Sequence, residues 1–182
     1  MLTNQIRRKV FISYHHADQW EAESFLQNYR PGPYGFIHRA LGLGMSQDII
    51  DSTDTDYIMR RIRDIYLGDS TVTIVLIGRC TWARRYVDWE IQASLRSGQW
   101  VLPNGLLGIV LPSAGWQPIP PDRLRMNLSL PMGRQGYARW YWYPQSGDDL
   151  NNMIEDAFQA RSTREHLIMN PRDRFGYNRT CA

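Results

Sequence analysis

Glu90 is the residue whose surroundings best suit it to chemistry. In the helix predicted for residues 82–97, Tyr86 lies one turn before Glu90, so the two share a stripe beside the apolar core stripe. The core stripe consists of Val87, Ile91 and Leu95. At this border between core and solvent, with Tyr86 and Trp89 near it, a carboxylate can be partly desolvated and directed at a ligand. The alternative is a solvated glutamate paired with Arg84 or another arginine.

Three other patterns make weaker cases for a site. His15 and His16 could bind a metal, but no cluster of Asp, Glu or His lies at a matching ligand spacing. Gly42-Leu43-Gly44 lacks the third glycine of a dinucleotide-binding fingerprint, and no G-x-x-x-x-G-K-[ST] phosphate loop is present in the sequence. Residues 137–143 interleave aromatic side chains with an arginine, which would suit base stacking, but a core or interface strand is the preferred interpretation.

The composition indicates one globular domain. The chain has 182 residues, 43% hydrophobic and 21% charged, which is enough to bury a core without disulfides or a structural metal. Lys9 is the only lysine among 21 basic residues, so the rest are arginine. This excess suits a phosphate-bearing ligand, although nucleotide bias in the genome is the preferred explanation. A net charge of +3 is too small to indicate nucleic-acid binding by itself.

The cysteines and the N-terminus bear on location. Cys80 and Cys181 are far apart and have no C-x-x-C or Cys/His spacing around them, which predicts neither a zinc site nor a disulfide framework. Residues 1–9 are polar and basic, with no apolar signal region behind them. No stretch approaches the roughly 18 apolar residues of a membrane helix. We therefore expect a cytoplasmic protein without a membrane segment.

The hydrophobic pattern predicts strands that alternate with helices. Buried strands are expected at 10–14, 71–77 and 106–111, weaker strands at 124–130 and 137–143, and helices at 20–29, 53–67, 82–97 and after the cap at 146–149. Thr53 and Asp56 are the expected capping pair of the second helix, and Gly68 and Gly98 the expected stops of the second and third. Residues 34–54 are expected to be irregular.

This order predicts an α/β fold of the flavodoxin-like type, in which a parallel sheet has helices on both faces. Ligands bind such sheets beyond the carboxyl ends of the strands. The segments expected to converge at that edge are 13–18, 78–90 and the loop from Pro112 onward. We expect a single domain over 1–168, with core motifs at 8–111 and an extension at 112–168, followed by a polar, mobile tail at 169–182.

Several of these segments resemble TIR domains. Residues 9–14, Lys-Val-Phe-Ile-Ser-Tyr, resemble their opening strand, and residues 70–78, Thr81-Trp82 and residues 85–91 resemble their later core. The sequence is most similar to the TIR-like proteins of bacterial Thoeris anti-phage systems, which share a VFIS(F/Y)H-type strand and a (S/R)xxVxWEI-type helix. The order and spacing of these motifs cover residues 8–111.

The resemblance implies NAD+-consuming chemistry in which a helix-borne glutamate is essential. That glutamate corresponds to Glu90, and Tyr86 stands where an aromatic residue, commonly Trp, precedes it by one turn. The basic positions that follow the first strand in some catalytic TIR domains correspond to His15 and His16, which are charged only part of the time near pH 7. The expected substrate-binding residues are Ser13, Tyr14, His15, Trp82, Arg84 and Tyr86.

The implied reaction needs no cofactor, since NAD+ is the substrate. Nicotinamide leaves as a neutral molecule, so the enzyme must chiefly stabilise an oxocarbenium-like ribose, and Glu90 would hold the ribose diol. Attack by water gives hydrolysis, whereas attack by an atom of the same ADP-ribose gives a cyclic product. In Thoeris relatives a cyclic ADP-ribose isomer activates a separate effector protein. The expected partners are thus NAD+, that effector, a phage-derived trigger and a second copy of the chain.

Two other function classes stay open at this point. One is a non-catalytic TIR-like interaction or scaffold module that assembles through its sheet edge or loops. The other, less favoured, is a nucleic-acid binder that uses residues 137–143.

Overall fold

The protein is built on a sheet of five parallel strands in the order β2-β1-β3-β4-β5. The computed structural model describes residues 7–29, 37–40, 54–98, 101–129, 133, 135–171 and 173–181. The strands are β1 Lys9–Ser13, β2 Ile37–Ala40, β3 Val72–Ile77, β4 Gly105–Val110 and β5 Arg139–Tyr141. This strand order is flavodoxin-like, which confirms the predicted fold class.

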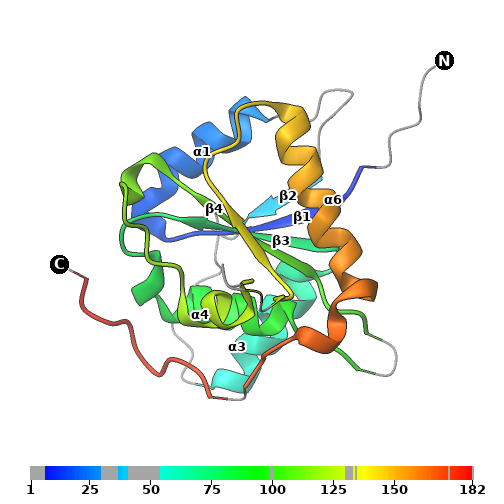
Figure 1. Ribbon diagram of the computed structural model, residues 1–182. Coiled ribbons are helices and arrows are strands. Elements are labelled where there is room, and N and C mark those ends of the chain that lie inside the picture. Colours follow the sequence, from blue (N-terminus) through cyan, green and yellow to red (C-terminus); the bar gives the residue numbers. More distant parts are fainter. Residues whose placement is uncertain are drawn as a thin grey trace.

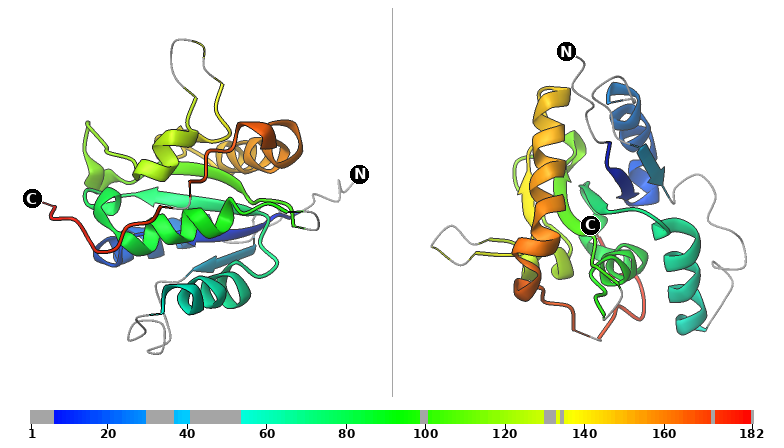
Figure 2. Two further views of the ribbon diagram at one scale, coloured as in Figure 1. Left: turned by 90° about the horizontal axis from the view of Figure 1, so that it is seen from below. Right: turned by 90° about the vertical axis from the view of Figure 1, so that its right-hand side faces the viewer.

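Helices cover both faces of the sheet (Figure 1). They are α1 Gln19–Asn28, α3 Thr55–Arg61, α4 Arg85–Ser94, α5 Asp122–Asn127 and α6 Gly147–Thr163. A π-helical turn, Ile62–Leu67, extends α3 as far as Gly68, whose φ of 38° ends the helix as predicted. Helices α1 and α6 lie on one face, and α3 and α4 lie on the other (Figures 1 and 2).

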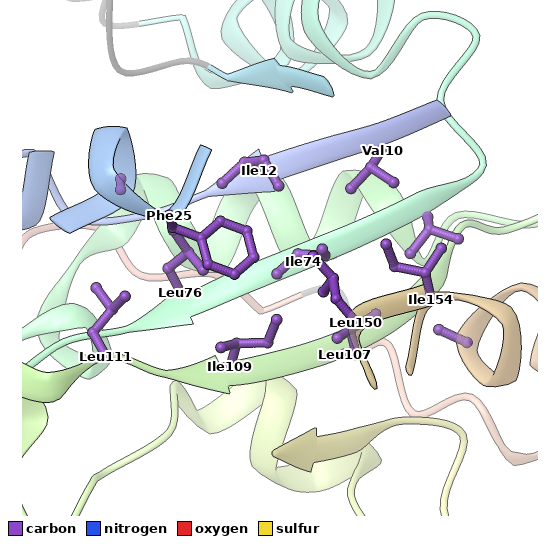
Figure 3. Packing of buried hydrophobic residues seen from close by; sticks show 13 residues of the cluster. Val10, Ile12, Phe25, Ile74, Leu76, Leu107, Ile109, Leu111, Leu150 and Ile154 are labelled. Carbon is purple, nitrogen blue, oxygen red and sulfur yellow. The ribbon is translucent and has the colours of Figure 1, made fainter. Parts of the chain in front are cut away.

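The core has one apolar layer on each face. On the side of α1 and α6, Phe25 packs with Ile74, Leu76 and Ile109 (Figure 3). On the side of α3 and α4, the core stripe of α4 packs on the opposite residues of β3 and β4. The two central strands are buried at every residue, as their wholly apolar sequences predict.

The structure corrects several predicted elements. Residues 122–127 form α5 and not a strand, because Pro121 precedes a turn that begins at Asp122 and buries Leu124 against the sheet. Residues 37–40 form β2 where irregular chain was expected; the rest of 34–53, including Gly42 and Gly44, lies outside the described residues.

The boundaries of two helices also differ from the prediction. Helix α4 begins at Arg85, since Arg84 has an extended backbone, and it ends at Ser94, before Gly98. Asp54 caps α3 by accepting hydrogen bonds from the N–H groups of Asp56 and Tyr57, so an aspartate takes the role predicted for Thr53.

Candidate active site at the β1–β3 edge

The carboxyl ends of β1 and β3 form the topological switch point of this sheet. The chain leaves β1 for the outer strand β2 and then returns to β3 on the other side of β1, so the helices that follow β1 and β3, α1 and α4, cover opposite faces of the sheet. Ser13, the last residue of β1, is in register with Val75 of β3. Two of the three predicted loops, 13–18 and 78–90, therefore meet at this edge.

A buried contact between two hydroxyl groups sets the position of α4 along the strands. Ser94 Oγ lies 2.8 Å from Thr73 Oγ1, and Thr73 is in register with Phe11. Glu90 lies one turn earlier on α4, which corresponds to about two residues further along the strands. That step reaches Ser13, which faces the same side of β1 as Phe11. Glu90 thus lies over Ser13.

Glu90 is a buried carboxyl group without a charged partner. Its side chain is only 3% exposed, and neither Glu90 Oε2 nor Ser13 Oγ completes a hydrogen bond with another described residue. Burial raises the pKa of Glu90 to about 8, although the nearby Ser13 hydroxyl opposes that rise. The group is therefore mostly neutral at pH 7. A solvated glutamate paired with Arg84 does not describe it, since the Arg84 Nε–H donates to the carbonyl of Cys80.

Tyr14 and His15 line the loop that follows β1. Burial raises the pKa of Tyr14, and the charges of Glu23 and Glu90 add to that rise, which places Tyr14 within electrostatic reach of Glu90. Burial and the positive charge of Arg84 lower the pKa of His15. His15 is thus neutral at pH 7 and offers hydrogen bonds to a ligand, but no fixed positive charge for a phosphate.

The predicted aromatic residues have different surroundings. Trp82 is half-buried in a 3-10 turn, Thr81–Ala83, between β3 and α4. Tyr86 packs on the α3 side, where its ring meets Trp89 edge-on at 5.5 Å and its hydroxyl accepts a hydrogen bond from Arg85. Trp89 is itself buried and donates to the carbonyl of Phe175, so its role is structural and not that of a neighbour to the Glu90 carboxyl.

Comparison with protein families decides the membership of this chain. Residues 11–115 match the family model described as Thoeris protein ThsB, TIR-like domain. The chain belongs to this family. The match begins within β1 and includes β3, α4 with Glu90, and β4, so this TIR-like domain has a role in Thoeris defence. No curated protein matches the chain.

Asp18 is a residue of this TIR-like domain that sequence reasoning did not single out. Its carboxylate is buried and lies where the Cβ of a larger residue at position 78 would be, so any side chain there would have to displace it. Thr81 Oγ1 accepts a hydrogen bond from the Gly78 N–H at 2.9 Å and lies 3.3 Å from Asp18 Oδ2, to which it donates. Burial raises the pKa of Asp18. The polar run after β1 and the glycine after β3 were the available signals.

The C-terminal residues of this TIR-like domain form an ordered strap, which corrects two predictions. We define the strap as residues 169–171 and 173–181, and it runs along the outer side of α4 (Figure 2, left). Cys181 forms a disulfide with Cys80, with 5.7 Å between the Cα atoms. Sequence spacing missed this bond because the fold, and not the local sequence, brings the two cysteines together. The polar tail is likewise held in place through its backbone carbonyls.

Arg123 anchors the first part of the strap. It is 2% exposed, forms a two-pronged ion pair with Asp88, and donates to the carbonyls of Pro171 and Asp173. A pocket of about 450 Å³ lies between the strap, α4 and α5, with Asp88, Arg123 and Phe175 in its lining; Glu90 is not part of it.

The described residues offer neither a metal site nor a membrane-spanning helix. They contain no group of three or more His, Cys, Asp or Glu side chains that could hold a metal ion. Among the same residues, no helix combines the length and the apolar character that crossing a membrane requires.

Proposed function

We propose that this protein is a TIR-type NAD+-cleaving enzyme that releases nicotinamide and forms a cyclic ADP-ribose-derived signal for a partner effector in anti-phage defence. The observation that carries the proposal is the Glu90 carboxyl group, which is buried over Ser13 at the β1–β3 edge and whose Oε2 has no hydrogen-bond partner among the described residues. Buried polar atoms are almost always hydrogen-bonded, and the exceptions need an explanation. A ligand that donates hydroxyl groups and carries positive charge is such an explanation.

NAD+ supplies both of these features. Its ribose diol can donate hydrogen bonds to Glu90, and its nicotinamide ring is cationic. A cation beside Glu90 favours the carboxylate form, so binding lowers the raised pKa and releases a proton. The negative charge is then present when the ribose becomes oxocarbenium-like. Because nicotinamide departs as a neutral molecule, the reaction needs no general acid.

Five of the other expected substrate-binding residues belong to the end of β1 or to the segments that follow β1 and β3, and Tyr86 packs toward α3. Ser13 and Tyr14 lie on the β1 side, and Trp82 and Arg84 lie on the β3 side of the edge. The neutral His15 would bind ribose or amide groups and would leave phosphate to Arg84. The 3% exposure of Glu90 fits a resting state that must open before NAD+ can reach the carboxyl group.

The test compares Glu90→Gln with wild type in an assay that separates NAD+, nicotinamide, ADP-ribose and its cyclic isomers by liquid chromatography and mass spectrometry. Since Glu90 is mostly neutral at pH 7, glutamine keeps its shape and leaves the fold intact. We expect NAD+ cleavage to fall by about 100-fold or more. The matched control is Glu155→Gln, which changes a partly exposed glutamate on α6 that pairs with Arg8. Equal cleavage by wild type and Glu90→Gln, or no product from cells under phage infection, would contradict the proposal.

A non-catalytic interaction module is the second candidate, and one surface favours it. Trp116, Trp140 and Trp142 are 94%, 39% and 54% exposed, and the ring of Trp142 lies 6.5 Å from that of Trp116 and 6.0 Å from that of Trp140 at the edge strand β5. Exposed aromatic groups of this kind mark contact surfaces. In light scattering, this candidate predicts complexes that Trp116→Ala and Trp142→Ala disrupt and Glu90→Gln leaves intact.

A further inference from the structure

The strap and α4 run antiparallel and are bonded at successive turns. The carbonyl of Pro171 accepts from Gln92, the carbonyl of Phe175 accepts from the indole of Trp89 at 2.9 Å, and the N–H of Phe175 donates to Asp88. Asp88 and Gln92 lie on the side of the helix turned away from Glu90, and Trp89 lies between that side and α3, with its ring packed in the core and its N–H directed at the strap. Helix α4 is therefore held between the sheet and the strap.

The last part of the strap holds the beginning of α4. The side-chain carbonyl of Asn178 accepts from the N–H of Arg85 at 3.0 Å, and the N–H of Arg179 donates to the carbonyl of Ala83. The N–H groups in the first turn of a helix have no partner within the helix, so the Arg85 N–H depends on Asn178 for its hydrogen bond. This part of the strap therefore completes the end of α4 nearest the candidate active site.

The noncovalent contacts of this last part lie at the surface: Arg179 also pairs with Asp122 on α5 at 2.8 Å, but both side chains are partly exposed, and surface ion pairs of this kind contribute little. Residues 176–180 are all exposed, whereas the first part of the strap is anchored by the buried Arg123. Exposed segments with few buried contacts open readily. The Cys80–Cys181 disulfide compensates by tying the end of the strap to the turn between β3 and α4. Both cysteines are partly exposed, so a thiol in solution can reach the bond.

We propose that the Cys80–Cys181 disulfide is a redox modification site that controls whether the last part of the strap, residues 176–181, stays on α4. The reductant is a dithiol, either a small molecule or a thioredoxin-like protein. One of its thiolates attacks a disulfide sulfur and breaks the Cys80–Cys181 bond, and its second thiol resolves the mixed disulfide. Two electrons pass to the protein, two protons end on Cys80 and Cys181, and the dithiol becomes a disulfide.

Release removes the hydrogen bond of the Arg85 N–H and frees the first turn of α4, while Arg123 keeps residues 169–171 and 173 in place. The redox step does not depend on any catalytic activity. Its consequence for Glu90 rests on the proposed function: a looser first turn of α4 gives NAD+ easier access, so reduction raises the rate of cleavage.

The first experiment counts thiols. Alkylation with iodoacetamide under denaturing conditions, read by mass spectrometry, should add no groups to the oxidised protein and two groups after treatment with dithiothreitol, since the chain has two cysteines. If protein that was purified without reductant and then oxidised still took up two alkyl groups, the proposal would be overturned.

The second experiment measures amide exchange by NMR. Dithiothreitol should remove the protection of the Arg85 N–H and leave the amides of Leu76 and Ile109 in the central strands protected. In the oxidised protein, Asn178→Ala should remove the same Arg85 protection without cutting the disulfide. The double variant Cys80→Ser with Cys181→Ser is the matched control, and it should be unprotected at Arg85 with or without dithiothreitol. Unchanged Arg85 protection in the reduced wild type, or loss of protection over the whole sheet, would overturn local release.

NAD+ cleavage by the oxidised and reduced wild type forms the last arm, with Glu90→Gln as the blank. Faster cleavage after reduction supports the consequence for Glu90, and equal rates overturn it. If neither form cleaves NAD+ above the blank, the proposed function fails, while the alkylation and exchange results still decide the redox step.

Discussion

The hydroxyl groups of Thr73 on β3 and Ser94 on α4 lie 2.8 Å apart in the core, and they form the middle of a hydrogen-bond chain that reaches Glu90. Asn104 Nδ2 donates to Thr73 Oγ1, Thr73 donates to Ser94, and Ser94 donates to the main-chain carbonyl of Glu90. Asn104 Nδ2 also donates to Ser70 Oγ, whereas each of the two hydroxyl groups donates to a single acceptor. The chain fixes the position of the proposed catalytic residue relative to the sheet.

Thr73→Val should destabilise the protein, because it keeps the shape of the side chain but leaves Asn104 without this acceptor and Ser94 without its donor. Loss of partners for buried polar groups costs about 1–3 kcal/mol. Urea unfolding measures the change. The control is Thr71→Val, which removes a more exposed hydroxyl bonded to the carbonyl of Lys9 and should cost clearly less. If both variants lowered the free energy of unfolding equally, the buried hydrogen-bond chain would contribute no more to stability than the hydrogen bond of Thr71.

The raised pKa of Glu90 makes stability depend on pH. Its pKa is about 8 in the folded protein against 4.5 for an ordinary glutamate, so between these values the folded form binds one more proton than the unfolded form. The contribution of Glu90 is therefore fully present below pH 4.5 and is lost as the pH rises to 8, by up to about 1.4 kcal/mol per pH unit. Glu90→Gln removes this slope. Urea unfolding of both proteins at intervals from pH 5 to pH 8 should give curves that diverge, and parallel curves would show that Glu90 is not buried in its neutral form.

Ser13 should tune the same ionisation in catalysis. If NAD+ cleavage needs the Glu90 carboxylate, kcat/KM rises with pH through a limb near 8. Ser13→Ala removes the hydroxyl that favours the charged form, so the limb should move to higher pH. The control is Ser162→Ala, an exposed residue on α6, which should leave the profile unchanged. If the rise of kcat/KM for Ser13→Ala occurred at the same pH as for wild type, Ser13 would have no influence on the ionisation of Glu90.

Gly78→Ala should disrupt the edge of the sheet, because the new methyl group would occupy the place of the Asp18 carboxylate. Overpacking of this kind costs about 1–3 kcal/mol. Gly147→Ala is a matched control, because nothing lies within 4 Å of a methyl group at that position. Thermal unfolding should show a lower midpoint for Gly78→Ala alone. Similar midpoints for both variants would mean that the Asp18 loop moves aside freely.

Arg123→Met should be among the most destabilising single changes, since it leaves the buried Asp88 carboxylate without its cation. Breaking a buried ion pair costs about 3–5 kcal/mol. Arg123→Lys should also destabilise, because one ammonium group cannot replace the planar fork that serves Asp88 and two strap carbonyls. Arg125→Lys, on the same helix but with a side chain 66% exposed, serves as the control. Chemical unfolding that ranks Arg125→Lys with Arg123→Met would refute this role for Arg123.

The sequence was sufficient to predict the central architecture. The apolar runs of β3 and β4 and the stripe of α4 specify buried surfaces, and their alternation specifies a parallel sheet with Glu90 near its carboxyl edge. Helix α5 was not predictable in this way, since Leu124 and Leu128 are compatible with either a short strand or a short helix. Packing against the sheet decides between them.

The roles of Asp18 and the strap could not be predicted from the sequence for a different reason. Their roles depend on pairs of residues far apart in the chain, such as Asp18 with Thr81 and Cys80 with Cys181, and no local pattern encodes such contacts. Spacing also left the charge state of Glu90 open. A border position on a helix is compatible with a solvated carboxylate. Only the packing of α4 against the sheet in the folded structure shows that the Glu90 carboxyl group is buried.

The disulfide also divides the chain topologically. Residues 80–181 form a closed covalent ring that includes α4, whereas β1 and Ser13 lie on the linear segment outside it. If the two ends of the oxidised protein were pulled apart, only the residues up to Cys80 could extend, and the ring would bear no tension along its length. The oxidised molecule would thus give a contour-length gain well short of the full chain, and reduction would release the remainder.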